Sequence, residues 1–164
     1  MAKAIVDLST AGIRLGYAIE SVSGTRPTAD YTNIPHPKEI PDLSPQPNAL
    51  DTSHLNIEAG GFKTYIEGLK DMGGSLAITM NMSAQLLSDW NSFVEDAKTA
   101  RAAGKRAWFV FYHPELEESF FMAGEPVRLD FPAASVDAVW EATVYIMPVD
   151  VLGWATAINP ADPQ

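Results

Sequence analysis

The chain has 164 residues, of which 46% are hydrophobic and 20% charged, and it contains no cysteine. This composition is that of an ordinary globular chain, and it excludes wholesale disorder, disulfide scaffolds and cysteine-based catalytic or metal sites. Acidic residues outnumber basic residues by 21 to 11, which gives a net charge of −10. That balance disfavours binding to nucleic acids or anionic membranes through Lys and Arg, although solubility alone is a sufficient explanation for it.

The first residues predict neither a membrane anchor nor a leader. No run of about 18 apolar residues occurs in the sequence, and its start lacks a basic region followed by an apolar segment. Residues 1–12 have weak periodicity, and we expect them to form an N-terminal arm on a single domain that spans residues 1–164.

Residues 13–22 alternate between apolar and polar side chains, which predicts a half-buried strand. Residues 24–49 contain six prolines, which remove backbone donors and predict a long loop with at most an edge strand. Two interpretations stay open: a surface loop ordered by its prolines, or an arm that contacts a neighbouring subunit. In the second case, deleting residues 26–47 is expected to leave a folded domain that no longer polymerises.

The middle of the chain contains the clearest elements. Residues 48–57 predict a weak strand, residues 62–69 an extended segment, and residues 75–82 a strand with strict alternation. Residues 84–103 carry an apolar stripe at helical spacing, which predicts an amphipathic helix. Ser83 is the expected N-cap, and Gly104 is the expected left-handed residue at the C-terminal end.

The remainder predicts further strands at residues 106–112, 119–122, 127–131 and 136–149, and a C-terminal tail at residues 150–164. One helix among many strands provides few crossovers for parallel pairing, so the sheets must be largely antiparallel. We therefore expect a mainly β fold: an antiparallel β-sandwich or barrel with one amphipathic helix packed outside.

The sequence carries no constellation typical of an enzyme. His36, His54 and His113 lack the spacing of a metal site, and no phosphate-binding glycine loop or nucleophile elbow occurs. Carboxylates are plentiful, but nothing selects a pair of them for acid–base work. We expect no catalytic residue, no cofactor and no metal. A small β-barrel enzyme or ligand carrier is kept as the alternative from another class.

The order of several short motifs over residues 34–147 resembles that of a known family. The run Tyr65-Ile66-Glu67-Gly68-Leu69-Lys70-Asp71-Met72-Gly73-Gly74 precedes the alternating strand, and a helix containing Trp90 follows. Gly104-Lys105-Arg106-Ala107-Trp108 and two later strands complete the order. This arrangement is similar to the major tail tube proteins of long non-contractile-tailed bacteriophages (the siphovirus type).

The resemblance implies a structural subunit of the phage virion. Such subunits form stacked hexameric rings around a tape measure protein, and the tube later passes double-stranded DNA without binding it specifically. The implied partners are other copies of the chain, the tape measure, the tail-tip or baseplate initiator and the tail terminator, with no membrane. The implied location is the virion tail, after synthesis in the host bacterial cytoplasm. An inner-tube protein of a contractile injection or secretion machine is the second possibility.

Two sets of residues follow from this resemblance. We expect two segments to contact neighbouring subunits. One is the long Pro-rich loop at residues 24–49, and the other is the glycine-bordered segment at residues 68–74. The inter-subunit candidates are Pro27, Ile34, Pro35, Ile40, Pro41, Leu43, Gly68, Leu69, Lys70 and Asp71. A negative lumen would repel DNA phosphates, and Glu20 and Glu141 are the candidate lumen carboxylates.

Overall fold

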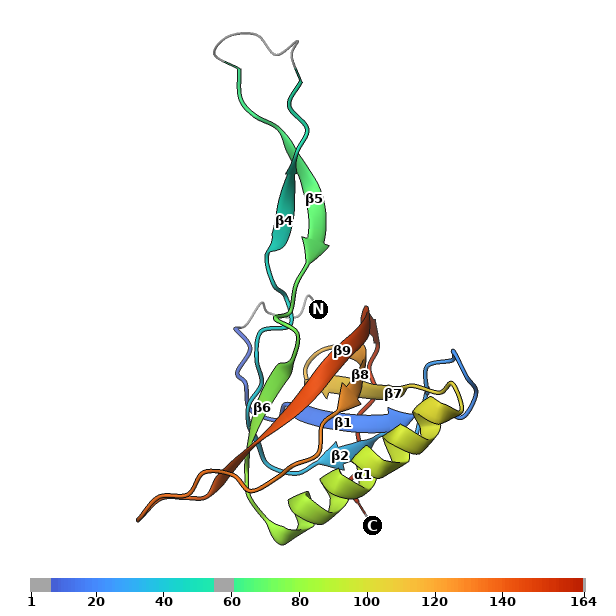
Figure 1. Cartoon of the computed structure of the whole chain (residues 1–164), viewed down its shortest axis with the longest axis vertical. Coiled ribbons are helices and arrows are strands. Elements are labelled where there is room, and N and C mark those ends of the chain that lie inside the picture. The colour runs from blue at the N-terminus through green and yellow to red at the C-terminus, as the bar shows by residue number, and fades with distance from the viewer. Residues whose placement is uncertain (1–6, 55–60, 164) are drawn as a thin grey trace, which may run out of the picture.

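The computed structural model describes residues 7–54 and 61–163. Figure 1 shows their arrangement as a rounded β body from which a narrow hairpin projects. The elements in chain order are β1 (Arg14–Ile19), β2 (Thr32–Ile34), β3 (Pro37–Glu39), β4 (Pro47–Asp51), β5 (Tyr65–Lys70), β6 (Leu76–Asn81), α1 (Ala84–Ala102), β7 (Ala107–Tyr112), β8 (Glu118–Pro126) and β9 (Glu141–Thr156).

Seven strands form one antiparallel sheet in the order β2-β1-β7-β8-β9-β6-β3. The two edge strands of this sheet, β2 and β3, are consecutive in the chain and are separated only by Pro35 and His36. His36 has a φ of 56°, a left-handed conformation that turns the chain sharply between the edges. The sheet is therefore nearly closed into a barrel. The predicted fold class, mainly β and antiparallel with one helix outside, is confirmed.

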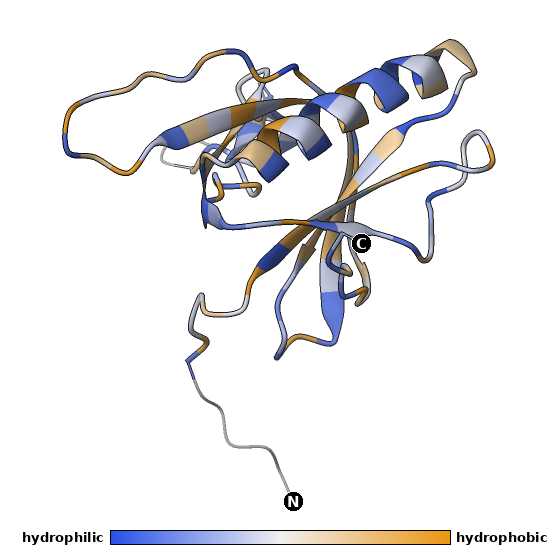
Figure 2. Ribbon diagram, turned by 90° about the horizontal axis from the view of Figure 1, so that it is seen from below, coloured by the Kyte–Doolittle hydropathy of each residue, from blue (hydrophilic) through white to orange (hydrophobic). Residues whose placement is uncertain are grey.

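The helix forms where local signals predicted it. The Ser83 hydroxyl accepts a hydrogen bond from the Leu86 N–H at 3.1 Å, as an N-cap does. At the other end, Gly104 has a φ of 75°, and the N–H groups of Gly104 and Lys105 donate to the carbonyls of Arg101 and Ala100. This pair of hydrogen bonds is a Schellman motif. Figure 2 shows the helix lying along the outside of the strands, with hydrophilic residues spaced along it.

The main core lies between this helix and the sheet. Trp90 and Phe93 of α1 pack in an edge-to-face arrangement, and Phe93 meets Phe109 of β7 in the same way. The cluster is completed by buried side chains from several strands: Leu15, Ile34, Leu76, Ile78, Met80, Met122, Val144 and Ile146.

The prediction that the first strand is buried on one face only is wrong. Gly16, Ala18 and Glu20, which point away from the main core, are buried as well. A second apolar cluster lies on that face and includes Tyr31, Trp108, Val110 and Phe121. The C-terminal segment covers part of it: a Cβ placed on Gly16 would lie 2.5 Å from the Cβ of Pro160.

Three predicted boundaries are corrected by the structure. The last strand extends to Thr156, so residues 150–156 are not a tail, and Ala161 forms a bridge with Thr32 of β2. Residues 127–131 form no strand and belong to a long connection between β8 and β9. Residues 24–49 are not one loop, because they supply β2, β3 and the start of β4.

Candidate functional site

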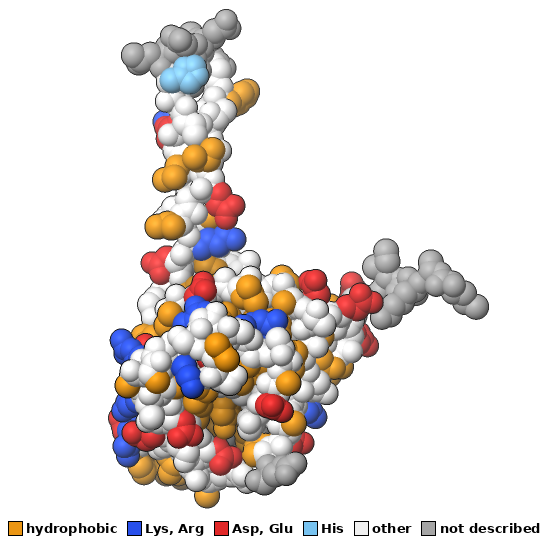
Figure 3. Space-filling view, turned by 90° about the vertical axis from the view of Figure 1, so that its right-hand side faces the viewer, with side chains coloured by type: hydrophobic (Ala, Val, Ile, Leu, Met, Phe, Trp, Pro, Cys, Tyr) orange, Lys and Arg blue, Asp and Glu red, His pale blue; other side chains and the backbone are white. Residues whose placement is uncertain are grey.

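The β4–β5 hairpin is the most distinctive feature of the surface. Figures 1 and 3 show it projecting from the barrel along the long axis of the molecule. Leu50 pairs with Ile66, and Asp51 pairs with Tyr65, across an antiparallel ladder. Successive residues of a strand point to opposite faces, so Leu50 and Ile66 share one face of this hairpin. Leu50 is 50% exposed and Ile66 is 58% exposed, although both are large and apolar.

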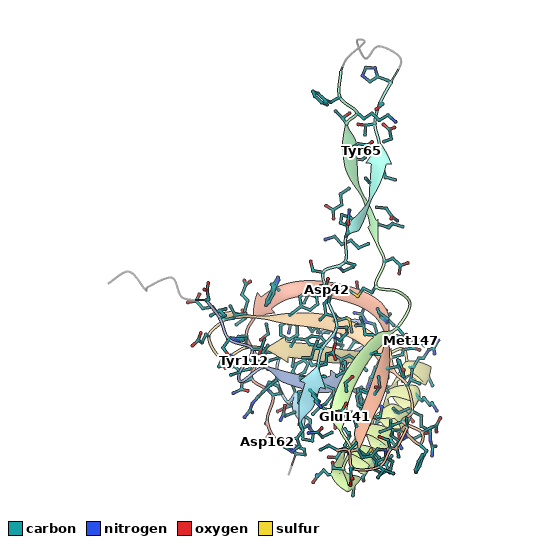
Figure 4. All side chains as sticks on the ribbon, turned by 90° about the vertical axis from the view of Figure 1, so that its left-hand side faces the viewer. Asp42, Tyr65, Tyr112, Glu141, Met147 and Asp162 are labelled. Carbon is teal, nitrogen blue, oxygen red and sulfur yellow. The ribbon has the colours of Figure 1, made fainter. Side chains whose placement is uncertain are left out.

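The opposite face of the hairpin is charged. Asp51 lies 3.8 Å from the ammonium of Lys63, and Glu67 lies 3.4 Å from that of Lys70. The Ser53 hydroxyl and N–H interact with the Asp51 carboxylate and hold its pKa below the ordinary value. Tyr65, labelled in Figure 4, shares this face. The hairpin is thus amphipathic, with an uncovered apolar face around Leu50 and Ile66.

A groove runs along the base of the hairpin. One wall contains Leu43 and Leu69, and Leu69 belongs to β5 of the hairpin. The other wall contains Val149, Val151 and Trp154 of β9. The Asp71 carboxylate accepts a hydrogen bond from the Gly73 N–H, and Gly73 and Gly74 both have positive φ, which fixes the turn from β5 into β6. The groove therefore joins the predicted glycine-bordered segment to the second half of β9.

That half of β9 is an apolar edge that sequence reasoning missed. Residues 141–146 pair with β6, whereas residues 147–156 pair only with β8. Large side chains beyond the end of β6 remain exposed: Met147, Val149, Val151, Leu152 and Trp154. Their run of alternating and consecutive apolar residues was a usable signal, but the predicted strand stopped at residue 149 and residues 150–164 were predicted to be a tail. An apolar strand edge of this length favours pairing with another chain.

The structure distributes the predicted inter-subunit residues unevenly. Ile34 is a correction, because it is 2% exposed in the main core and cannot contact a neighbour. Ile40 and Leu43 pack partly against that core, and Pro27 accepts a hydrogen bond from the Tyr31 hydroxyl at its carbonyl. The groove brings together a subset of the candidates: Ile40, Pro41, Leu43, Leu69, Lys70 and Asp71. Pro35 stays at the β2–β3 corner, away from this set, and Gly68 lies within the hairpin ladder.

Glu20 is a second correction, since it does not face a lumen. Its side chain is fully buried and accepts hydrogen bonds from the Trp108 Nε1, the Gly24 N–H, and the N–H and Nε of Arg106. Burial raises the pKa of Glu20, but these hydrogen bonds outweigh burial and hold the pKa below the ordinary 4.5. The carboxylate is therefore a charged structural group that joins β1 to β7.

Glu141, labelled in Figure 4, has partners that the sequence did not reveal. Its carboxylate forms an ion pair with the Lys38 ammonium, and the two side chains are 39% and 55% exposed, respectively. This contact joins β9 to β3 across β6. A lumen role for Glu141 stays a prediction, with the charge of this carboxylate offset by Lys38.

Within residues 7–54 and 61–163, no group of three or more His, Cys, Asp or Glu side chains could hold a metal ion. No helix in the same part of the chain is long and apolar enough to cross a membrane. The described surface is instead defined by the hairpin, the groove at its base and the apolar edge of β9.

These features define the class of protein by its fold: a nearly closed antiparallel barrel with one outer helix and a projecting amphipathic hairpin. No family model matches the chain, and no curated protein matches it. The chain is similar to one chain of a solved structure described as the "Cryo-EM structure of the anti-feeding prophage (AFP) baseplate, 6-fold symmetrised". The match covers 92% of this chain and 95% of that chain, at 13% identity and a TM-score of 0.49.

Proposed function

We propose that the chain is a non-catalytic structural subunit of a phage tail tube, which stacks as hexameric rings around a tape measure protein. The tube then serves as the channel for double-stranded DNA. The motif order over residues 34–147 supports this proposal from the sequence side. On the structural side, the uncovered hairpin is the observation that carries it.

An isolated two-stranded hairpin is marginally stable in water. The β4–β5 hairpin nevertheless presents Leu50 and Ile66 on one face, with Phe62 93% exposed and Leu69 84% exposed along its length. Exposed apolar surface of this kind marks a protein-interaction site. If the hairpin packs against a neighbouring subunit, that subunit covers the apolar face of the hairpin and stabilises the two strands at the same time.

The proposed partners follow from the same role. Other copies of the chain would form the rings, an initiator at the tail tip or baseplate would start the tube, and a terminator would end it. The subunit would be made in the host cytoplasm and would reside in the virion tail. The net charge of −10 would keep DNA phosphates from binding the wall, with carboxylates other than the buried Glu20 supplying the repulsion.

The test is negative-stain electron microscopy of the purified full chain, concentrated and held for several days. Rings or tubes with a central channel are the expected result. Compact monomers that retain a small molecule would instead overturn the proposal and favour a ligand carrier or an enzyme. Particles recovered with a contractile sheath would assign the same subunit to a contractile machine.

A hairpin-less variant sharpens this test. Pro47 and Lys70 are paired at the base of the hairpin, so residues 48–69 can be replaced by a short Gly-Ser turn. This variant is expected to remain a folded monomer by circular dichroism and to form no tubes; normal tubes would contradict the role of the hairpin. The deletion of residues 26–47 expected from the sequence is unsuitable, because it removes the buried Tyr31 and Ile34.

A further inference from the structure

A small depression with an apolar floor and a basic rim lies where α1 ends. Its floor includes Val94 and Ala97 of α1 and Pro126 of β8, and its rim carries Lys98, Arg101 and Lys105. Figure 3 views the barrel from this side, where Lys and Arg side chains lie among apolar ones. We refer to this site as the basic pocket. Four of the 11 basic residues of the chain fall within residues 98–106, and all four line the pocket together with one carboxylate, that of Glu125.

The basic side chains of the pocket differ in the ion pairs that they form. Arg106 is committed to the fold, because it pairs with the buried Glu20 and with Asp150. Arg101 pairs with Glu125, and Lys98 lies 3.5 Å from Glu95, both at exposed positions where such pairs are weak. Lys105 forms no ion pair with any residue that the structure describes.

The Schellman motif at the end of α1 holds the backbone of Lys105 in place, since the Lys105 N–H donates to the Ala100 carbonyl at 2.9 Å. The ammonium of Lys105 is thus presented at the rim by a fixed backbone. A group of opposite charge can bind there without first displacing an internal partner.

The opposite end of β7 carries the complementary charge. The turn between β7 and β8 contains Glu115 and Glu117, and β8 begins at Glu118. All three are exposed, and none forms an ion pair with a described residue. Figure 1 shows β7 running from the end of α1 to the other side of the barrel, and its six residues span about 20 Å. Figure 4 labels Tyr112, where the strand ends. No carboxylate of this turn can therefore reach the pocket of its own chain.

The acidic turn is held rigidly. The Glu115 N–H donates to the Nδ1 of His113, which leaves the proton on Nε2 to donate to the Ser9 carbonyl at 2.6 Å. The Glu117 carbonyl accepts a hydrogen bond from the Ala157 N–H. Because the turn is ordered before any contact, little conformational entropy is lost when it binds.

We propose that the acidic turn of one copy, Glu115 to Glu118, docks into the basic pocket of the next copy. This inference rests on the proposed function and names the lateral contact within a ring. A contact that joins two different surfaces of the same chain is heterologous, and it closes into a ring when the rotation allows. A head-to-tail contact requires the two surfaces to lie on different sides of the subunit. The basic pocket and the acidic turn meet this requirement, because they lie at opposite ends of β7.

The experiment uses charge reversal in the full chain, with Lys105→Glu and Glu117→Lys made separately. Each reversal places like charges in the contact, and each is expected to raise the protein concentration needed for assembly about tenfold or more. Arg128→Glu, an exposed reversal outside the pocket and the turn, is the matched control and should leave assembly unchanged. Thermal unfolding of each variant checks that the fold is intact, and Lys98→Glu replaces Lys105→Glu if that variant is unstable.

Mixing the two reversed variants gives the decisive readout. In an alternating ring, the reversed pocket of one variant meets the reversed turn of the other, and the remaining contacts have their original charges. An equimolar mixture is therefore expected to assemble near the wild-type concentration, whereas each variant alone does not.

The outcomes separate this inference from the proposed function. If the wild-type chain assembles and the single reversals assemble equally well, the charge contact is wrong while the tube proposal stands. If both reversals abolish assembly and the mixture fails to restore it, the two surfaces do not meet and the inference is also wrong. A wild-type chain that never associates overturns both.

Discussion

The indole Nε1 of Trp108 donates a hydrogen bond to the Oε1 of Glu20 across 2.8 Å, on the face of the barrel that lies away from the helix. Together with the Arg106 guanidinium and two backbone N–H groups, this contact satisfies a carboxylate that is fully removed from solvent. Removing the charge of Glu20 would weaken four hydrogen bonds at a buried site and leave Arg106, whose side chain is 33% exposed, with Asp150 as its remaining ion-pair partner among the described residues. The stability of the barrel should therefore depend strongly on this one carboxylate.

We predict that Glu20→Gln lowers the free energy of unfolding by about 2 kcal/mol at pH 7, the loss expected when hydrogen bonds to a buried charged group are weakened. Urea denaturation followed by tryptophan fluorescence measures the change. Glu39→Gln, at an exposed position, is the control and should change stability by less than about 0.5 kcal/mol. A similar loss in both variants would contradict a special role for Glu20.

The same carboxylate predicts a pH dependence. The pKa of Glu20 is lower in the folded chain than its ordinary value of 4.5, so its contribution is fully present above pH 4.5. The contribution is lost as the pH falls through the lower folded-state pKa. The difference in unfolding free energy between wild type and Glu20→Gln should therefore shrink in urea titrations below about pH 4. A constant difference down to pH 2 would argue against this linkage.

Two side chains of the helix hold the connection between β8 and β9: the Trp90 indole donates to the Val127 carbonyl at 2.8 Å, and the Asn91 amide contacts Leu129. The Asn91 Oδ1 accepts from the Leu129 N–H at 3.0 Å, and its Nδ2 donates to the Leu129 carbonyl at 3.4 Å. Asn91→Ala should lower stability by about 1–2 kcal/mol and speed hydrogen exchange at the Leu129 amide. Asn91→Asp keeps the acceptor and should preserve protection of that amide; loss of protection in both variants would point to a general loosening instead.

A fourth prediction concerns Gly16, where a Cβ would lie 2.5 Å from the Pro160 Cβ and 3.1 Å from Val110. Gly16→Ala should displace the C-terminal segment, lower stability by about 1–3 kcal/mol and make that segment sensitive to carboxypeptidase. Pro160→Gly removes the closest atoms, so the double variant should regain part of the lost stability. Equal stability of Gly16→Ala and wild type would show that the segment moves aside without cost.

The fifth prediction separates the hairpin from the barrel. A Cβ on Gly68 would lie 2.7 Å from the Asn48 carbonyl oxygen, so Gly68→Val should force β4 and β5 apart. The barrel should keep its unfolding free energy to within about 0.5 kcal/mol, because Gly68 does not touch the core. Tube formation, followed by electron microscopy, should be lost. Ala49→Val is the neighbouring control on the other strand; if both variants assemble, an intact hairpin ladder is not required.

Elements set by local signals could be predicted from the sequence. The helix has a capping residue at Ser83, a left-handed glycine at Gly104 and a regular apolar stripe between them, and all three depend on neighbours along the chain. Residues 75–82 likewise alternate strictly, and β6 buries Leu76, Ile78 and Met80 as expected. These patterns needed no knowledge of distant contacts.

Elements that depend on distant pairing could not be predicted. Pro37 and Pro47 each begin a strand at an edge position, where a missing N–H costs no ladder bond, so proline content alone misrepresented the segment. Glu20 was expected at the surface because a strand with alternating apolar and polar residues usually has one face exposed to solvent. The residues that bury it, Arg106 and Trp108, lie more than 80 positions away in the chain.

The candidate site was recovered only in part for the same reason. Leu69, Lys70 and Asp71 do lie in the groove, but its other wall comes from Val149 to Trp154, and residues 150–154 of that segment were predicted to be a tail. The basic pocket depends on α1 and β8 meeting at Pro126. Contacts of this kind become visible only once the sheet order is known.

The short corner at Pro35 and His36 has a consequence for how the chain is made. It joins the two edge strands of the sheet, β2 and β3, early in the sequence. In the sheet, β3 pairs with β6, and β6 is linked to the remaining strands through β9, which ends at Thr156. The ribosome must therefore synthesise the chain through the end of β9 before the barrel can close. Because most pairings are long-range, closure should be the slow step of folding. An unfinished chain lacks the groove wall that β9 supplies, so only completed subunits present the full surface to a growing assembly.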